Sequence, residues 1–403
     1  MRTEISPTVT FASERLPIQR RYDLDWLRVM VFGLLIFYHV GMLFVADWGY
    51  HYKSQHQAEW LQNLMIFLNQ WRLPLLFLIS GIAIRLFLNK VTLLRFLGLR
   101  TVRLWVPLLF GIWVIVPPQL YIEMLSKGDL PQISYGQFYQ AFLDLSHPYF
   151  ESYQSGIFPH VDVNHLWYIR ELWYFSMYLL IIYGGLSLFK LMPYLYQPFK
   201  SWSITTTGVL LVVGMGVLHF FLFPEDSEGR RKALGFSFLC LGFLIGQEKS
   251  FWSQVSQHRK KLLLLAVISF SVLIFYYHKY YQDRVDAPKD LLYFFEIMLV
   301  YLNRFAWILA ILGFAHQHLN RNHRWLKYLN EAVYPYYILH QTFIIVLAYW
   351  LRDSGAVTQP VLVIVLTFLG CALVYELIRR LKVLRLLFGL KIGSTKSSGY
   401  RVK

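Results

Sequence analysis

The chain of 403 residues is 56% hydrophobic and 18% aromatic but only 15% charged, whereas about a quarter of the residues in a soluble domain are charged. This composition excludes a soluble globular protein, a disordered chain and a collagen-like chain. The formal net charge of +16 does not indicate nucleic-acid binding, because the cytoplasmic loops of membrane proteins carry an excess of Lys and Arg. We therefore expect an integral membrane protein with a lipid bilayer, and no nucleic acid, as partner.

Apolar blocks of about 20 residues recur along the chain, and this is the length of a helix that crosses a bilayer. They predict an all-α, polytopic membrane protein with about ten transmembrane helices, organised as a single membrane domain over residues 1–403. The first block contains His39 and lacks a small-residue cleavage site, so we expect a retained span rather than a signal peptide. The expected spans are 26–47, 61–88, 104–126, 166–189, 202–223, 233–247, 262–281, 291–316, 333–351 and 360–378.

Lys and Arg are unevenly distributed between these spans, with 27 in the segments on one side and 9 on the other. The positive-inside rule then predicts that both termini are cytoplasmic. The expected cytoplasmic segments include residues 1–25 and the basic tail 379–403, and the longest external loop is 127–165. That loop is rich in Tyr, Phe and carboxylates, a mixture that suits sugar binding and an interfacial aromatic belt equally well.

Three arginines lie inside the expected spans: Arg72, Arg170 and Arg304. Each costs at least about 2.5 kcal/mol at a helix centre, so each should face protein or a wet cavity. Structural pairing is the alternative to a functional role, since Arg170 adjoins Glu171 and Arg304 follows Glu296 by eight residues on a similar helix face. Arg72 has no acid in its own span and is the strongest functional candidate.

The first span aligns a cation with a histidine. Arg28 and His39 are eleven positions apart, which is within about 20° of three full helical turns, so they share a face roughly 16 Å apart. Arg28 lies at the predicted cytoplasmic boundary, and His39 lies in the bilayer. This arrangement suits an anionic co-substrate that reaches from the cytoplasm to an imidazole able to transfer protons near neutral pH.

Further motifs follow in order along the chain. The second span carries Arg72-Leu-Pro74 before Phe77-Leu-Ile-Ser80-Gly81, and residues 100–107 read Arg-Thr-Val-Arg-Leu-Trp-Val-Pro. Residues 117–119 read Pro-Pro-Gln, the fourth span opens with 165–168, His-Leu-Trp-Tyr, and the ninth carries 334–340, Tyr-Pro-Tyr-Tyr-Ile-Leu-His. This ordered set, together with Tyr-Glu at 375–376, resembles the acyltransferase-3 family of integral-membrane acyltransferases over about residues 20–390. It looks most similar to the branch that succinylates periplasmic glucans.

The resemblance implies roles for particular residues. The family's basic residue followed by ten residues and His falls on Arg28 and His39, with Asp25 at the acidic position upstream. Its second-span Arg falls on Arg72 and its loop arginines on Arg100 and Arg103. The His-Leu-Trp element falls on His165 and Trp167, and the ninth-span motif ends at His340. After His340 this chain has Gln341-Thr342, where related glucan enzymes tend to show another His and a Pro.

These residue types fit acyl transfer on chemical grounds. Arg28, Arg100 and Arg103 could hold the phosphates of an acyl thioester, or they could serve only to fix topology. His39 could deprotonate an acceptor hydroxyl or carry the acyl group itself, and we favour the general base. Arg72 could stabilise the oxyanion formed at the thioester carbonyl.

The remaining candidates support this centre. His165 could orient the acceptor or the base, and we expect it to act in catalysis. Trp167 and His340 are expected to have supporting roles. Asp25 is a supporting residue that could simply pair with Arg28, three positions further on.

Other function classes fit the sequence less well. A transporter or flippase for an acylated or anionic molecule or glycan is the main alternative, because intramembrane Arg and His also mark substrate pathways, but no repeat between the two halves is visible. No His is followed by Glu, which excludes a His-Glu-x-x-His metalloprotease, and Ser80 lacks the Gly-x-Ser-x-Gly pattern of a serine hydrolase. Cys240 and Cys371 lie in apolar blocks and are expected in the core, with no metal site.

The sequence therefore predicts an O-acyltransferase of a bacterial inner (plasma) membrane. It would move an acetyl or succinyl group from a cytoplasmic donor, acyl-CoA as co-substrate, to a hydroxyl of a cell-envelope glycan. No permanently bound cofactor is expected.

Overall fold

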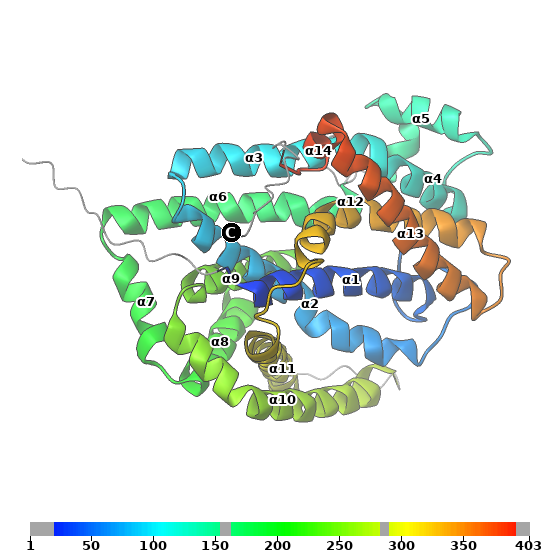
Figure 1. The fold of residues 1–403 in the computed structure, drawn as a ribbon. Helices are drawn as coiled ribbons and strands as arrows, with labels where there is room; N and C mark the ends of the chain where they lie inside the picture. Colours follow the sequence, from blue (N-terminus) through cyan, green and yellow to red (C-terminus); the bar gives the residue numbers. More distant parts are fainter. Residues whose placement is uncertain (1–19, 154–162, 283–289, 392–403) are drawn as a thin grey trace, which may run out of the picture.

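The computed structural model describes residues 20–153, 163–282 and 290–391, and these residues form helices and no strand beyond one isolated bridge between Val45 and Ala58 (Figure 1). The first half contains α1 (Tyr22–Phe44), α2 (Leu61–Leu88), α3 (Leu93–Phe110), the π-helix η1 (Gly111–Ile115), α4 (Val116–Lys127), α5 (Tyr135–Leu143), the 3₁₀ helices η2 (Pro148–Tyr153) and η3 (Asn164–Leu166), α6 (Trp167–Leu188) and α7 (Met192–Ser201). The second half contains α8 (Ile204–Val217), the π-helix η4 (Leu218–Leu222), α9 (Ser227–Ile245), α10 (Lys249–Tyr277), the π-helix η5 (His278–Gln282), α11 (Asp290–His318), α12 (Leu326–Trp350), α13 (Thr358–Arg380) and α14 (Lys382–Leu387).

Nine helices of the described part are long and apolar enough to cross a membrane, which confirms the expected all-α polytopic membrane fold. The segment expected as the tenth span, 233–247, is helical within α9. It does not meet the same criterion, because the first turns of α9 carry Arg230, Arg231 and Lys232. The helix is nevertheless part of the bundle, since it packs along the length of α2. Packing against α2 therefore stabilises α9 in the bundle, although its apolar stretch is shorter than that of the other spans.

Glycines allow α2 and α9 to approach each other closely. A Cβ atom on Gly242 would overlap the backbone of Leu78, and one on Gly81 would overlap the backbone of Leu239. The structure thus places Gly242 directly against α2. This close approach fixes the position of Arg72, which lies on α2.

We expect Gly242→Ala to destabilise the protein by about 1–3 kcal/mol, because neither backbone can yield to the added methyl group. Gly184→Ala on α6 is the matched control, since a Cβ there meets nothing within 4 Å and should be neutral or slightly stabilising. Thermal unfolding in detergent measures both variants. Equal midpoints for the two would contradict the close packing of α2 and α9.

The start of α1, the start of α12 and the end of α13 lie at one face of the bundle. Asn330 at the start of α12 donates to Asp25 at the start of α1, at 3.0 Å. Tyr328, also at the start of α12, donates to Glu376 at the end of α13, at 2.8 Å. We call this the basic face, because Arg20, Arg21, Arg28 and Lys90 line one cavity there. Its assignment to the cytoplasm remains a prediction, and so does a single domain for the whole chain.

The segment expected as a purely external loop, 127–165, contains regular structure. It begins at the last residue of α4 and includes α5, η2 and η3, while residues 154–162 lie outside the described part. Phe138, Phe142 and Phe150 are fully buried against one another and so form a small core that caps the bundle. These rings are therefore used for packing rather than presented to a sugar. Tyr135 remains exposed.

Two expected cytoplasmic segments also differ from simple loops. Arg100 and Arg103 were expected in a loop but lie on α3, which begins eleven residues before the expected third span because Thr92 caps its N-terminus through the Arg95 amide. The expected basic tail begins within α13 and continues as α14, where Phe388 packs on Phe110 of α3 at 5.3 Å between ring centroids. Residues 1–19 and 392–403, which the terminal assignments also include, lie outside the described part.

Candidate active site

Two histidines from opposite ends of the chain meet inside the bundle. The Nδ1 atom of His39 on α1 lies 2.8 Å from the Nε2 atom of His340 on α12. Their rings are stacked, with centroids 4.9 Å apart and an interplanar angle of 19°. His340 is fully buried, and His39 is partly accessible. The structure therefore joins the principal catalytic candidate to a residue that the sequence assigned only a supporting role.

The hydrogen bonds of this pair fix which nitrogens carry protons. The Nδ1 atom of His340 lies 2.6 Å from the carbonyl oxygen of Tyr337 and must donate to it. In a neutral ring the Nε2 atom of His340 is then an acceptor, so it accepts the Nδ1–H of His39. The remaining nitrogen of His39, Nε2, keeps a free lone pair. This chain of bonds prepares His39 Nε2 to accept a proton.

His165 joins the same cluster but offers no free nitrogen. Its ring centroid is 5.4 Å from that of His340. Its Nε2–H donates to the carbonyl of Ile338 at 2.9 Å, and its Nδ1 accepts from the side-chain amide of Gln119 on α4 at 3.1 Å. Both nitrogens are thus occupied in joining α4, η3 and α12. The structure makes His165 a positioning residue in this state.

The two residues that depart from the family pattern also belong to this framework. Gln341 donates to the side chain of Asn164 at 2.6 Å, and Thr342 donates to the carbonyl of Ile115 in η1 at 2.7 Å. Asn164 has a φ of 47°, a left-handed conformation that Asn tolerates better than most residues. Its side chain also accepts from the His165 amide at 2.8 Å. Gln341 therefore helps to hold the turn that presents His165.

Arg72 provides the positive charge of the cluster. Its guanidinium lies over the ring of Tyr38, 3.4 Å from the centroid, and the residue is only 4% exposed. Its charge acts on both His39 and His340. The Nε and Nη1 atoms are buried and have no hydrogen-bond partner among the described residues. Each unsatisfied buried donor costs about 1–3 kcal/mol, so this arginine is prepared to bind an acceptor atom.

The loop after α1 covers His39 from the side opposite the basic face. Tyr50 stacks on the His39 ring with centroids 6.2 Å apart, and its buried hydroxyl has no partner among the described residues. Burial raises the pKa of Tyr50 above its ordinary value. The hydroxyl therefore stays protonated and can donate or accept a hydrogen bond. Next to it, His51 contacts Glu123 of α4 at 2.6 Å, and Glu123 also binds Lys127.

A second group gathers at the basic face. Arg28, Arg100 and Arg103 lie close enough for their charges to act on one another. Arg100 donates from Nε to Ser176 at 3.1 Å, while its buried Nη2 has no partner among the described residues. Arg100 and Arg103 line a cavity of about 560 Å³ between α3 and α14, and Arg28 lines a neighbouring cavity of about 370 Å³. The three side chains thus form one basic patch.

Asp25 has a partner other than Arg28. It forms an ion pair with Arg20 at 2.7 Å, and Asn330 donates to it. Asn330 in turn accepts from Arg28 at 3.5 Å. The direct pairing of Asp25 with Arg28 that the sequence left open is therefore replaced by a bridge through Asn330, which leaves the Arg28 charge without a bound carboxylate.

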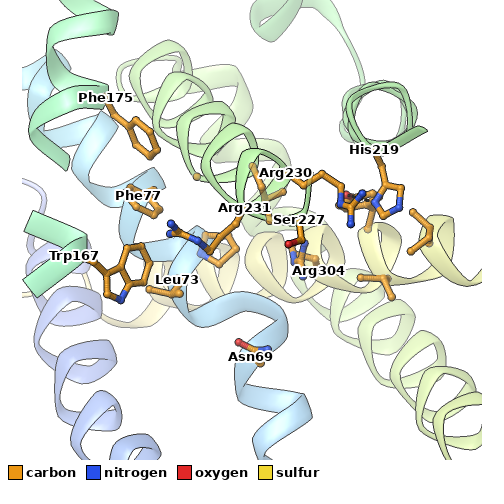
Figure 2. A pocket seen from close by; sticks show the side chains of 16 residues that line it. Asn69, Leu73, Phe77, Trp167, Phe175, His219, Ser227, Arg230, Arg231 and Arg304 are labelled. Atoms are coloured by element: carbon orange, nitrogen blue, oxygen red, sulfur yellow. Dashed lines mark hydrogen bonds between the residues drawn. The ribbon is translucent and has the colours of Figure 1, made fainter. Parts of the chain in front are cut away.

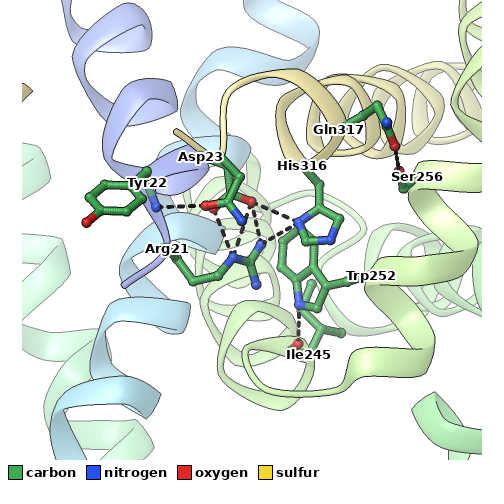
Figure 3. A network of polar contacts seen from close by, with 9 residues as sticks. Arg21, Tyr22, Asp23, Ile245, Trp252, Ser256, His316 and Gln317 are labelled. Carbon is green, nitrogen blue, oxygen red and sulfur yellow. Dashed lines mark hydrogen bonds and ion pairs between the residues drawn. The ribbon is translucent and has the colours of Figure 1, made fainter. Parts of the chain in front are cut away.

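A network beside the basic patch ties together the ends of three helices (Figure 3). Arg21 binds Asp23 at 2.6 Å and lies over the ring of Trp252, 3.9 Å from the centroid. His316 of α11 also contacts Asp23, at 3.1 Å. These contacts fix the start of α1 against α10 and α11, and thereby set the position of Arg28 two turns further along.

The structure separates Trp167 from the other candidates. Its ring lies under the guanidinium of Arg231, 4.4 Å from the centroid, in a different cavity (Figure 2). The neighbouring Tyr168 instead contacts Tyr337 and shares a hydrogen bond of 3.1 Å with Ser80. The His-Leu-Trp element therefore contributes to two places in the bundle rather than one.

The sequence candidates thus form two groups joined by α1. His39, Arg72, His165 and His340 form the inner cluster, and Arg28, Arg100 and Arg103 form the basic patch. Although three histidines meet in the inner cluster, no group of His, Cys, Asp and Glu in the described residues is arranged to hold a metal ion. Sequence reasoning missed the contributions of Tyr50, Gln119 and Tyr337. Gln119 follows two prolines and Tyr337 lies in the ninth-span motif, but Tyr50 gave no signal.

Comparison with known proteins identifies the family. A family model described as an acyltransferase domain matches residues 21–376, which include every member of the inner cluster and of the basic patch. The chain belongs to the acyltransferase-3 family.

Similarity to individual proteins is more limited. The chain is 26% identical over 113 residues to "Glucans biosynthesis protein C" of Escherichia coli strain K12, and equally to the proteins of the same name in Escherichia coli O1:K1 / APEC and O9:H4 strain HS. The match spans 28% of this chain and only 29% of the length of these curated relatives. No solved structure matches this acyltransferase-3 chain.

Proposed function

We propose that this protein is a membrane O-acyltransferase that moves an acyl group, acetyl or succinyl, from cytoplasmic acyl-CoA to a hydroxyl of a cell-envelope glycan. The observation that carries the proposal is the chain of hydrogen bonds from the Tyr337 carbonyl through His340 to His39, which leaves a lone pair on His39 Nε2. Such an oriented imidazole is the usual form of a general base. A buried arginine beside it supports transfer of a group through an anionic intermediate.

The proposed reaction begins with proton removal. His39 Nε2 accepts the proton of the acceptor hydroxyl as its oxygen attacks the thioester carbonyl carbon. The carbonyl oxygen becomes an oxyanion, which the unpartnered donors of Arg72 bind. The C–S bond then breaks, and the thiolate takes the proton from His39. The products are an ester on the acceptor and free CoA thiol, and His39 returns to its starting state.

The basic patch supports the donor end of this proposal. Arg28, Arg100 and Arg103 combine several guanidinium groups that lack bound carboxylates, and such groups bind phosphates well. The roughly 16 Å between Arg28 and His39 along α1 is the distance that the thiol arm of the donor would cover. The excess of Lys and Arg on this side favours a cytoplasmic position in a bacterial inner membrane, with both termini cytoplasmic.

The acceptor end is argued from the opposite side of the bundle. Tyr50 and the His51–Glu123 pair lie beyond His39, away from the basic face. The acceptor would approach His39 from this side, separate from the donor path, once Tyr50 moves off the His39 ring. A glycan is the proposed acceptor class because the matched relatives are named for glucan biosynthesis. We propose no permanently bound cofactor.

Release of CoA thiol tests the proposal. Inside-out membrane vesicles that contain the protein and enclose the glycan fraction of the same cells are given acetyl-CoA or succinyl-CoA from outside, and free thiol is measured. We expect release only with acceptor present, with Arg28→Gln raising the donor KM about tenfold at similar kcat. Arg379→Gln, a half-exposed arginine that pairs with Glu376 at the same face, is the matched control. Release that never exceeds that of vesicles without the protein would contradict the proposal.

His340 is expected to act through His39 rather than on substrate. His340→Leu should lower kcat about 10–100-fold, the size of effect seen when a partner that orients a functional imidazole is lost. His340→Gln should recover part of this loss, because its side-chain oxygen can accept the His39 Nδ1–H. Steady-state kinetics with both variants measures the difference. Equal loss in the two variants would assign His340 a packing role only.

A further inference from the structure

A third cavity is lined in part by α2 and contains none of the residues of the histidine cluster. It has a volume of about 380 Å³ and is lined by residues of α2, α6, η4, α9 and α11 (Figure 2). Its polar groups include Arg230, Arg231, Arg304 and His219, and no Asp or Glu lines it. Arg230 and Arg304 form no ion pair with a carboxylate among the described residues, so the cavity has a positive potential.

Arg304 is held in this cavity by a backbone carbonyl of α2 that a proline leaves without its helical donor. Pro74 has no amide hydrogen, so the carbonyl of Gln70, four residues earlier, loses its helical partner. Arg304 Nε donates to this carbonyl at 2.8 Å. Its two terminal nitrogens have no hydrogen-bond partner among the described residues. Glu296, which the sequence offered as a partner for Arg304, instead accepts from Tyr281 at 2.8 Å, so the Arg304 charge is not neutralised.

The other two arginines are also oriented by neighbouring groups. Arg230 donates to the carbonyl of Phe223 at 2.8 Å. Arg231 stacks on Trp167 and forms long ion pairs with Glu171 at 3.8 Å and with Glu228 at 3.7 Å, which are not direct charged hydrogen bonds. Both guanidinium groups therefore keep donors for a ligand.

The rest of the lining is apolar. Leu73, Phe77, Phe175, Leu234 and Ile297 form its walls, and Figure 2 shows Phe77 and Phe175 on the same side as Trp167. Asn69, near the start of α2, places the cavity in the half of the bundle opposite the basic face. A ligand of this cavity thus has an anionic group and a hydrocarbon part, and it lies within the depth of the membrane.

We propose that this cavity binds the phosphate group of an anionic lipid, with the arginines on the phosphate and the hydrocarbon part against the apolar walls. Guanidinium groups bind phosphate through two hydrogen bonds, and the apolar walls suit the hydrocarbon part of a lipid. The site does not rest on acyl transfer, because its residues are separate from the histidine cluster and from the basic patch.

Native mass spectrometry of the full-length protein in detergent tests this proposal. The protein is titrated with phosphatidylglycerol, with phosphatidylcholine or with inorganic phosphate. We expect one phosphatidylglycerol retained at concentrations where phosphatidylcholine is lost, and a retention at least tenfold weaker in the double variant Arg230→Gln/Arg231→Gln. Lys232→Gln is the matched control, because Lys232 lies on the same helix, pairs with Glu228 at 2.7 Å and does not line the cavity.

The double variant carries the test because Arg304→Gln removes the partner of the Gln70 carbonyl and could unfold α2. A thermal midpoint within a few degrees of the wild type verifies that the double variant is folded. Unchanged retention in this folded variant would overturn the proposal. Binding of inorganic phosphate without retention of phosphatidylglycerol would also overturn it, since the ligand would then be a free anion.

Discussion

Replacing His39 by alanine is expected to lower kcat of acyl transfer by about 10²–10⁴-fold, the contribution of a well-placed general base. The physical reason is the loss of the Nε2 lone pair that the bonds from Tyr337 through His340 orient. The donor KM should change little, because His39 lies roughly 16 Å along α1 from Arg28. Steady-state thiol release from vesicles, with the amount of protein normalised, measures both constants.

His258→Ala is the matched control for this variant. His258 is a partly buried histidine on α10 that binds the carbonyl of Gln254 at 2.9 Å, outside both groups of candidate residues. We expect it to retain wild-type kcat. A His39→Ala protein that is as active as His258→Ala would remove His39 from the chemistry.

Arg72→Gln is expected to lower kcat by about 10²–10³-fold, the usual cost of removing one oxyanion donor. The guanidinium is buried over Tyr38 with two unpartnered nitrogens, so its charge acts at low dielectric, where it is most effective. Arg72→Lys should recover only part of the rate, since a lysine keeps the charge but loses the planar set of donors. Comparing kcat of the wild type, Arg72→Lys and Arg72→Gln separates the contribution of the charge from that of the planar donors.

Arg170→Gln controls for the removal of a charge from a membrane span. Arg170 lies 3.7 Å from Glu171, and Arg231 is a second cation near the same carboxylate, so the loss should be tolerated with kcat within twofold of the wild type. A similar loss of rate in Arg170→Gln and Arg72→Gln would indicate that both act through stability. Thermal midpoints of the two variants distinguish that result.

The sequence predicts most of the fold, because a bilayer allows few alternatives. Backbone groups must be satisfied within each segment, so apolar blocks of about 20 residues become helices. The prediction of spans was weakest for a helix that packs mainly against other helices rather than against lipid. The segment 233–247 is short for a span, and α9, which contains it, begins with Arg230, Arg231 and Lys232. Gly242 and Gly81 nevertheless let α9 pack tightly on α2.

The sequence also selects several site residues but not their partners. His39, Arg72 and His165 could be selected because a buried polar side chain in a span is costly. The bond between His39 and His340 could not, since it joins residues 301 positions apart. Which ring nitrogens of His340 and His39 carry protons depends on the Tyr337 carbonyl, and no side-chain pattern reveals this.

Arg304 shows why local spacing misleads. The eight-residue spacing to Glu296 suggested an ion pair within α11, but the side chain turns towards α2. The signal that explains this lies in Pro74, which leaves the Gln70 carbonyl without its helical donor. A proline inside a span thus indicates a polar partner on a neighbouring helix.

Mass spectrometry of cell-envelope glycans tests the central claim most directly. The glycans are taken from cells that produce the wild-type protein, His39→Ala or no protein. A mass increment of one acetyl or succinyl group found only with the wild type is the predicted result, and it also identifies the acyl group. An increment that persists in His39→Ala, or that occurs without the protein, would contradict acyl transfer at this histidine.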